Sequence, residues 1–235
     1  MILLVSVAIF AVFAVVLALY LRAEVKNDGK NGFARATGLK LTLSGLFCAT
    51  GILSYLLMIN VVNVNVPTQL FVLLGLFSGL IGDFFMQYMG LHIKKYITGV
   101  LCFAATQVLF ITYLLKIGMP DLAGWIITLV ITAAVIIFIL VLMKKQNWQL
   151  GREKAVITLY TVLISFMAVR AIVYAAGQPS ASSVIFATGA ALCWSSDLLL
   201  GIWNYYSHKR VLVNSNWIVY FSGMLCIAFS ILPAL

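Results

Sequence analysis

Residues 122–143 read LAGWIITLVITAAVIIFILVLM and contain no charged side chain. A helix of this length rises about 33 Å, enough to cross the roughly 30 Å hydrocarbon core of a bilayer. Similar apolar stretches recur along the chain. We predict eight membrane-spanning helices, at about residues 2–21, 41–59, 69–90, 96–116, 122–143, 155–176, 184–203 and 217–234. The first lacks the basic start and small-residue cleavage site of a signal peptide, so we expect it to be retained.

The composition of the whole chain is that of an integral membrane protein. Of its 235 residues, 64% are hydrophobic and only 9% are charged, and the mean hydropathy is +1.12. Soluble domains average about 25% charged residues. No linker or low-complexity segment separates the spans. We therefore expect residues 1–235 to form one all-α domain, a single bundle of eight transmembrane helices whose backbone groups are satisfied within each helix.

The basic residues lie on one side of the predicted topology. All 15 Lys and Arg residues except Lys116 and Arg170 fall in or beside the loops that follow the first, third, fifth and seventh spans. The positive-inside rule places these loops in the cytoplasm and both termini on the non-cytoplasmic side. The net charge of +9 thus reflects topology, and we expect no nucleic-acid partner. The predicted location is a membrane, the cell membrane if the source is bacterial.

The cysteines and histidines argue against a metal or disulfide framework. All 4 cysteines fall within predicted spans, without a CxxC pair, and are expected to behave as small apolar residues. The chain has 2 histidines, His92 and His208, both in predicted cytoplasmic loops. A zinc hydrolase that uses three intramembrane histidines is therefore excluded. We expect neither a metal nor another cofactor.

Two of the 6 acidic residues, Asp83 and Asp197, lie inside predicted spans. Both spans run toward the cytoplasm, and both carboxyl groups lie roughly 10 Å below the cytoplasmic surface. Ionisable groups in a membrane span usually face the bundle interior and mark functional sites. Small residues share their helical stripes: Gly75, Gly79, Gly189, Cys193 and Gly201. These stripes have two interpretations, space for a ligand or packing seams in which each aspartate bonds to a neighbouring helix.

Two cations accompany these acids. Lys40 opens the second span, and Arg170 lies in the sixth on a stripe with Tyr160 and Tyr174. Two acids and two cations in one cavity would suit a zwitterionic phospholipid headgroup, with a cation meeting the phosphate. A proton-coupled transporter would use the same residues. Alternatively, Lys40 is an interfacial anchor and Arg170 a structural partner of one aspartate.

Three motifs surround these residues: LLGLFSGLIGDFFM at 73–86, LYTVLISFMAVRA at 159–171 and GAALCWSSDLLLG at 189–201. With Lys40, they resemble the YhhN family of integral membrane lysoplasmalogenases, and the resemblance covers nearly the whole chain. Departures from the family pattern are Leu41 for a proline, Gln107 for a histidine and Met224 for a glutamine. Gln107 still forms hydrogen bonds but cannot titrate.

The resemblance implies hydrolysis of the vinyl ether bond of lysoplasmalogens to a fatty aldehyde and glycerophosphoethanolamine or glycerophosphocholine. It implies Asp83 and Asp197 as catalytic residues and a lysophospholipid and membrane lipids as partners. The implied substrate contacts are Lys40, Gln107, Tyr160, Arg170, Tyr174 and Ser196.

Such a reaction begins with protonation of the outer alkene carbon, so one carboxylic acid and one carboxylate are needed, as in glycosidases. Burial favours a neutral carboxyl group, and two acids close together titrate separately. We hypothesise that Asp83 and Asp197 share one proton; the sequence does not assign which of them is the acid.

Other functions fit less well. An intramembrane aspartyl protease needs G-x-G-D, whereas residues 79–83 read GLIGD, and the PAL at 233–235 ends the chain instead of lining a helix. A transporter predicts helices broken by glycine or proline, yet all 4 prolines lie at loops or span ends. A family member that binds lipid without catalysis remains an alternative because of Gln107.

Overall fold

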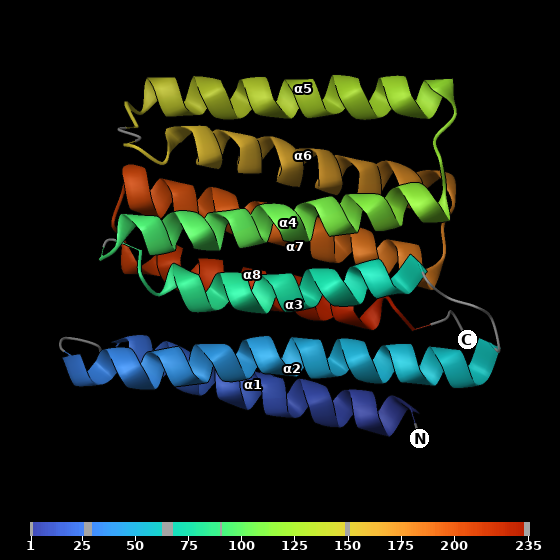
Figure 1. Ribbon diagram of the computed structural model, residues 1–235, viewed down its shortest axis with the longest axis horizontal. Helices are drawn as coiled ribbons and strands as arrows, with labels where there is room; N and C mark the ends of the chain where they lie inside the picture. Colours follow the sequence, from blue (N-terminus) through green and yellow to red (C-terminus); the bar gives the residue numbers. More distant parts are fainter. Residues whose placement is uncertain (1, 26–29, 63–67, 90, 149–150, 233–235) are drawn as a thin grey trace.

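The computed structural model of the chain is all helical (Figure 1). It describes residues 2–25, 30–62, 68–89, 91–148 and 151–232, without the side chains of residues 2–7, 24–25, 30–35 and 60–62. Lys26, the predicted loop at 63–67 and the PAL segment at 233–235 lie outside the described residues, as do the side chains of Lys30 and Arg35.

Every predicted span corresponds to a helix. The helices are α1 (Ile2–Val25), α2 (Lys30–Val62), α3 (Thr68–Met86), α4 (Ile93–Ile117), α5 (Leu122–Lys145), α6 (Lys154–Gly177), α7 (Ala181–Tyr205) and α8 (Arg210–Phe229). The largest differences from the prediction are the early starts of α2 and α8. In α8, polar residues interrupt the apolar pattern near its start, but Asn216 is 2% exposed because it faces the bundle. Hydropathy alone therefore placed this start too late.

Most of these helices can cross a membrane. Within the described residues, 7 helices are long and apolar enough, namely α2 to α8, and α1 contributes a shorter apolar segment at Ala8–Ala23. No strand occurs in the described part of the chain. The chain thus has the character of a multi-pass membrane protein, while the eighth span and the side on which the termini lie stay predictions.

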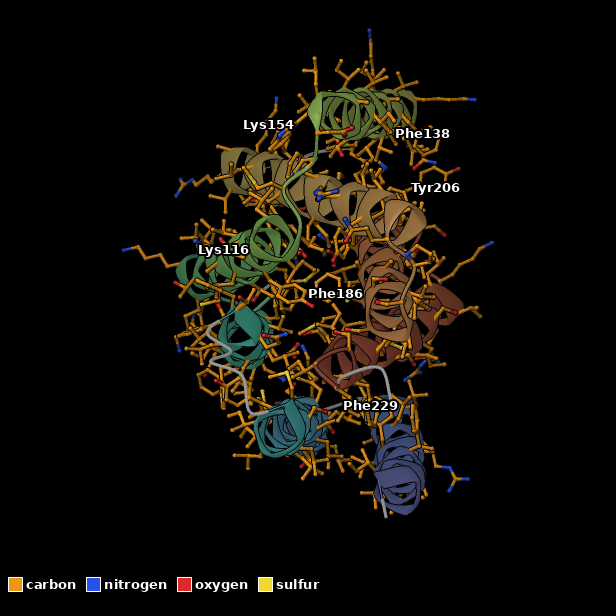
Figure 2. All side chains as sticks on the ribbon, turned by 90° about the vertical axis from the view of Figure 1, so that its right-hand side faces the viewer. Lys116, Phe138, Lys154, Phe186, Tyr206 and Phe229 are labelled. Carbon is orange, nitrogen blue, oxygen red and sulfur yellow. The ribbon has the colours of Figure 1, made fainter. Side chains whose placement is uncertain are left out.

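Successive helices run antiparallel, with α5 at one edge of the molecule and α1 at the other (Figures 1 and 2). The last residues of α3, α5 and α7 and the first residues of α4, α6 and α8 gather at one end, on the left in Figure 1. Basic residues cluster there in the helix ends and connections: Lys94, Lys95, Lys144, Lys145, Arg152, Lys154, Lys209 and Arg210. We call this the basic end; Lys116 lies at the opposite end, as the charge pattern predicts.

Close packing positions the two helices that carry the aspartates. On α7, a methyl group added at Gly189 would lie 2.7 Å from the carbonyl oxygen of Gly223 in α8, so only glycine permits this approach. On α3, a methyl group at Gly75 would lie 2.3 Å from the ring of Phe110 in α4. Phe110 packs edge-on against Phe186 of α7 with ring centroids 5.8 Å apart, and Figure 2 shows Phe186 in the bundle interior. These glycines are packing positions.

Candidate functional site

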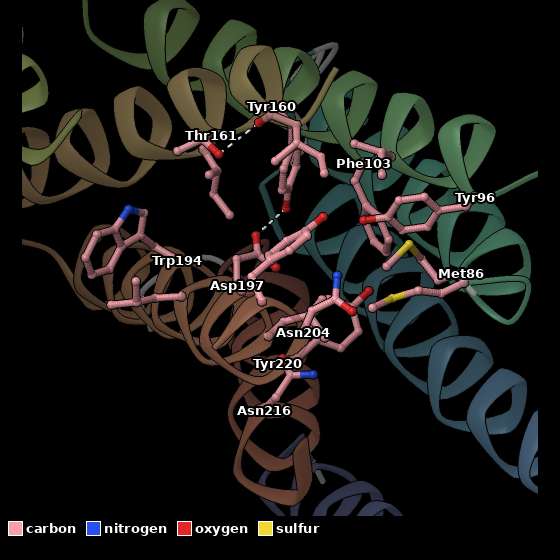
Figure 3. A pocket seen from close by; sticks show the side chains of 18 of the residues that line it. Met86, Tyr96, Phe103, Tyr160, Thr161, Trp194, Asp197, Asn204, Asn216 and Tyr220 are labelled. Atoms are coloured by element: carbon pink, nitrogen blue, oxygen red, sulfur yellow. Dashed lines mark hydrogen bonds between the residues drawn. The ribbon is translucent and has the colours of Figure 1, made fainter. Parts of the chain in front are cut away.

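A pocket lies in the half of the bundle nearest the basic end (Figure 3). Residues of α2 to α8 line it, and both intramembrane aspartates are among them. Its polar lining also includes Lys40, Tyr160, Asn204, Asn216 and Tyr220. The prediction that Asp83 and Asp197 face a common interior is therefore matched by the geometry.

Asp83 has the partners of an ionised carboxylate. Its Oδ1 lies 3.3 Å from Lys40 Nζ, and both side chains are almost fully buried, 1% and 4% exposed respectively. Its Oδ2 accepts hydrogen bonds from Ser44 Oγ at 2.7 Å and from the Tyr220 hydroxyl at 2.8 Å. The ammonium group of Lys40 also lies over the Trp217 ring, 4.4 Å from its centroid. Three donors on two other helices thus stabilise negative charge on Asp83.

Asp197 has a different environment. The Tyr160 hydroxyl donates a hydrogen bond to its Oδ2, and the two side chains point toward each other in Figure 3. The Gln107 side chain hydrogen-bonds the same hydroxyl and does not line the pocket. Among the described side chains, the Lys40–Asp83 contact is the one ion pair, so no described cation pairs with Asp197. The two acids therefore differ in their electrostatic surroundings, and Asp83 is the more deeply buried of them.

Aromatic side chains separate the partners of the two acids. Tyr220, which bonds Asp83, and Tyr160, which bonds Asp197, pack against Phe103 with centroids 6.0 and 6.4 Å from its ring. The described hydrogen bonds of each carboxyl group go to its own set of side chains. The hypothesis that the two carboxyl groups share one proton stays a prediction.

The other predicted substrate contacts divide into two groups. Lys40 and Tyr160 line the pocket together with the aspartates. Gln107 touches Tyr160 without lining the pocket, and its Oε1 is buried without a described hydrogen-bond partner. Ser196 is fully buried and donates to the Cys193 carbonyl of its own helix, so it also lies outside the lining.

Arg170 and Tyr174 lie elsewhere, which corrects the expectation that they share a cavity with the aspartates. Arg170 follows Tyr160 by ten positions in α6, roughly 15 Å further from the basic end along the helix axis. Its Nη2 donates to the carbonyl of Gly118, the C-cap of α4, and its guanidinium lies 5.5 Å from the Tyr174 ring centroid. The partial negative charge of a helix C-terminus offsets the buried cation there.

Some residues of the site were missed by the sequence analysis. Ser44 follows Lys40 by one helical turn, and this spacing alone would have placed both on one face. Trp148 and Tyr205 line the pocket beside the ends of α5 and α7, where aromatic residues are typical of a membrane interface, and Asn216 lines it from the seventh position of α8. Within the described residues, no three His, Cys, Asp or Glu side chains form a group that could hold a metal ion.

The fold and the site define a class: a polytopic helical membrane protein with two acids in one amphipathic pocket. The model of the YhhN family matches residues 44–231, which is most of the chain. The chain therefore belongs to the YhhN family, as the motifs around the two aspartates predicted. No curated protein and no solved structure matched the sequence.

Proposed function

We propose that the protein hydrolyses the vinyl ether bond of lysoplasmalogens, releasing a fatty aldehyde and a glycerophospho-base. The observation that carries the proposal is that two acids with unlike partners, Asp83 and Asp197, line one pocket. Membership of the YhhN family is compatible with a hydrolase. A vinyl ether needs both a proton donor and an anionic group for its cleavage, and unlike environments supply this difference between two carboxyl groups.

The pocket lining suits an amphiphilic substrate. Apolar side chains from three helices contribute to it, among them Val100 of α4, Ile139 of α5 and Ile164 of α6. Polar and aromatic side chains lie at the basic end, among them Asn204 and Tyr205 at the end of α7. A lysoplasmalogen with its hydrocarbon chain toward the middle of the bundle and its headgroup at the basic end would place its vinyl ether bond beside Asp83 and Asp197.

In the proposed first step, Asp197 is the acid. No described cation pairs with it, so it lacks the charge compensation that Asp83 receives from Lys40, and we assign it the proton. Its proton goes to the outer carbon of the alkene, leaving a positive charge shared by the inner carbon and the ether oxygen. Asp83, held ionised by Lys40, Ser44 and Tyr220, stabilises this cation.

In the second step, water adds to the inner carbon and its proton passes to Asp83. The hemiacetal that results collapses: its hydroxyl proton moves to the glycerol oxygen as the carbon–oxygen bond breaks. The products are the aldehyde and the free hydroxyl of the glycerophospho-base, so one water is consumed. Return of the proton from Asp83 to Asp197 restores the starting state.

The test is release of fatty aldehyde from lysoplasmenylethanolamine by the protein purified in detergent. Asp197→Asn and Asp83→Asn should each lower kcat by at least about 100-fold, the usual contribution of a general acid or base. Ser195→Ala is the matched control, because this neighbour of Asp197 donates to the Ala191 carbonyl and lies outside the pocket lining. Retained activity in either aspartate variant contradicts the two-acid mechanism. Absence of aldehyde from the wild type, with lipid still bound, would favour a lipid-binding family member.

A further inference from the structure

Two aromatic residues are fixed at the basic end of the pocket. Trp148, just beyond α5, stacks on Tyr205 of α7 with ring centroids 5.4 Å apart and planes 27° apart. The Trp148 Nε1 donates to Gln146 at 2.9 Å, and a methyl group at Gly201 would lie 2.9 Å from the indole ring. Both rings line the pocket. The contacts of Trp148 with Gln146, at the end of α5, and with Gly201 and Tyr205 of α7 set the ring positions before any ligand binds.

A carboxylate adjoins these rings. The Tyr205 hydroxyl lies 3.5 Å from Glu153 Oε1, and the Tyr96 hydroxyl interacts with that of Tyr205. Glu153 is half-buried and also accepts a hydrogen bond from the Gly151 amide at 3.3 Å. It sits among basic residues, yet it forms no ion pair within the described part of the chain. Both described hydrogen-bond donors of this carboxylate, the Tyr205 hydroxyl and the Gly151 amide, are uncharged.

This combination matches a substituted ammonium group. Aromatic faces attract such a cation through the ring quadrupole, and a nearby carboxylate adds its charge. We propose that Tyr96, Trp148, Glu153 and Tyr205 form a subsite for the ammonium group of a zwitterionic lysophospholipid. The subsite holds the headgroup with residues other than Asp83 and Asp197, which leaves these two aspartates available for chemistry.

The spacing of the subsite from Asp197 agrees with the size of the lipid, a point that rests on the proposed function. Tyr205 follows Asp197 by eight positions in α7, roughly 12 Å along the helix axis. Nine bonds separate the ether oxygen of a choline lysoplasmalogen from its nitrogen. At about 3.3–3.6 Å for each three bonds, this chain spans roughly 10–11 Å when extended. An ammonium group at Tyr205 therefore puts the ether oxygen at the level of Asp197.

The test measures binding, which does not require turnover. The full-length protein in nanodiscs is titrated with ester-linked lysophosphatidylcholine and, separately, with lysophosphatidylglycerol of the same chain. The wild type should bind the choline lipid at least about tenfold more tightly, in the range of a desolvated cation–π contact. Glu153→Gln should remove most of this preference, although its amide oxygen still accepts from Gly151. Trp148→Leu should do the same, whereas Trp125→Leu, which alters a ring stacked on Phe166 outside the pocket lining, should not.

Equal affinity of the wild type for the two lipids overturns the subsite, as does an unchanged preference in Glu153→Gln. These outcomes are separate from the fate of the proposed function. Choline preference that is lost in Glu153→Gln, in a protein that releases no aldehyde, keeps the subsite and removes the hydrolase. Aldehyde release by a protein without choline preference keeps the hydrolase and removes the subsite.

Discussion

The buried ion pair of Lys40 and Asp83 gives the sharpest prediction about stability. Its atoms lie 3.3 Å apart in side chains that are 4% and 1% exposed. Two unit charges at this separation attract each other by about 5 kcal/mol at an effective dielectric constant of 20. Desolvation of both groups offsets much of this energy, so the pair contributes little compared with an apolar pair.

Removal of one partner is a different matter, because it leaves a buried charge without compensation. Lys40→Met should lower the free energy of unfolding by about 3–5 kcal/mol, since Asp83 keeps only Ser44 and Tyr220. Asp83→Asn should cost a similar amount through the unpaired ammonium group. The double variant should be much more stable than the sum of the two losses predicts, with a coupling energy of about 3 kcal/mol or less.

Equilibrium unfolding of the purified protein in mixed micelles of rising dodecyl sulfate content measures these values. Lys95→Met is the matched control, because Lys95 also lies over an aromatic ring, 3.9 Å from the Tyr88 centroid, but is exposed. Its loss should cost under about 1 kcal/mol. Additive losses in the double variant, or a Lys40→Met protein as stable as the wild type, would refute the assignment of Asp83 as the charge-paired acid.

Two further variants test the packing and the placement of Arg170. Gly189→Ala should lower the free energy of unfolding by about 1–3 kcal/mol, because the new methyl group meets the Gly223 carbonyl. Gly45→Ala is the control: a methyl group there has nothing within 4 Å, so the variant should be neutral or slightly stabilising. Equal effects at the two sites would contradict the tight α7–α8 contact. Arg170→Met should cost about 1.5–3 kcal/mol through the lost bond to the Gly118 carbonyl. The same variant should leave KM for lysoplasmalogen unchanged, and a raised KM without loss of stability would return Arg170 to the substrate site.

The sequence by itself determined the helices, the segregation of basic residues and the position of the two aspartates along their helices. Each of these is a local property. An apolar run such as residues 122–143 has one low-energy conformation in lipid, a helix, whatever its neighbours are. The distance of Asp83 and Asp197 from the ends of their helices follows from counting residues to the nearest loop at a fixed rise per residue. The family motifs around them added the identity of the family.

Only the tertiary structure decided which cation meets which acid. Lys40 and Arg170 looked equivalent as partners in the sequence, but Lys40 pairs with Asp83 and Arg170 caps α4 at the other end of the bundle. The stacking of Trp148 on Tyr205 could likewise not be predicted, because the two residues come from separate parts of the chain. Counting residues at a fixed rise gives how far along its helix a residue lies. The rotation of each helix and the order of its neighbours decide which side chain that residue touches.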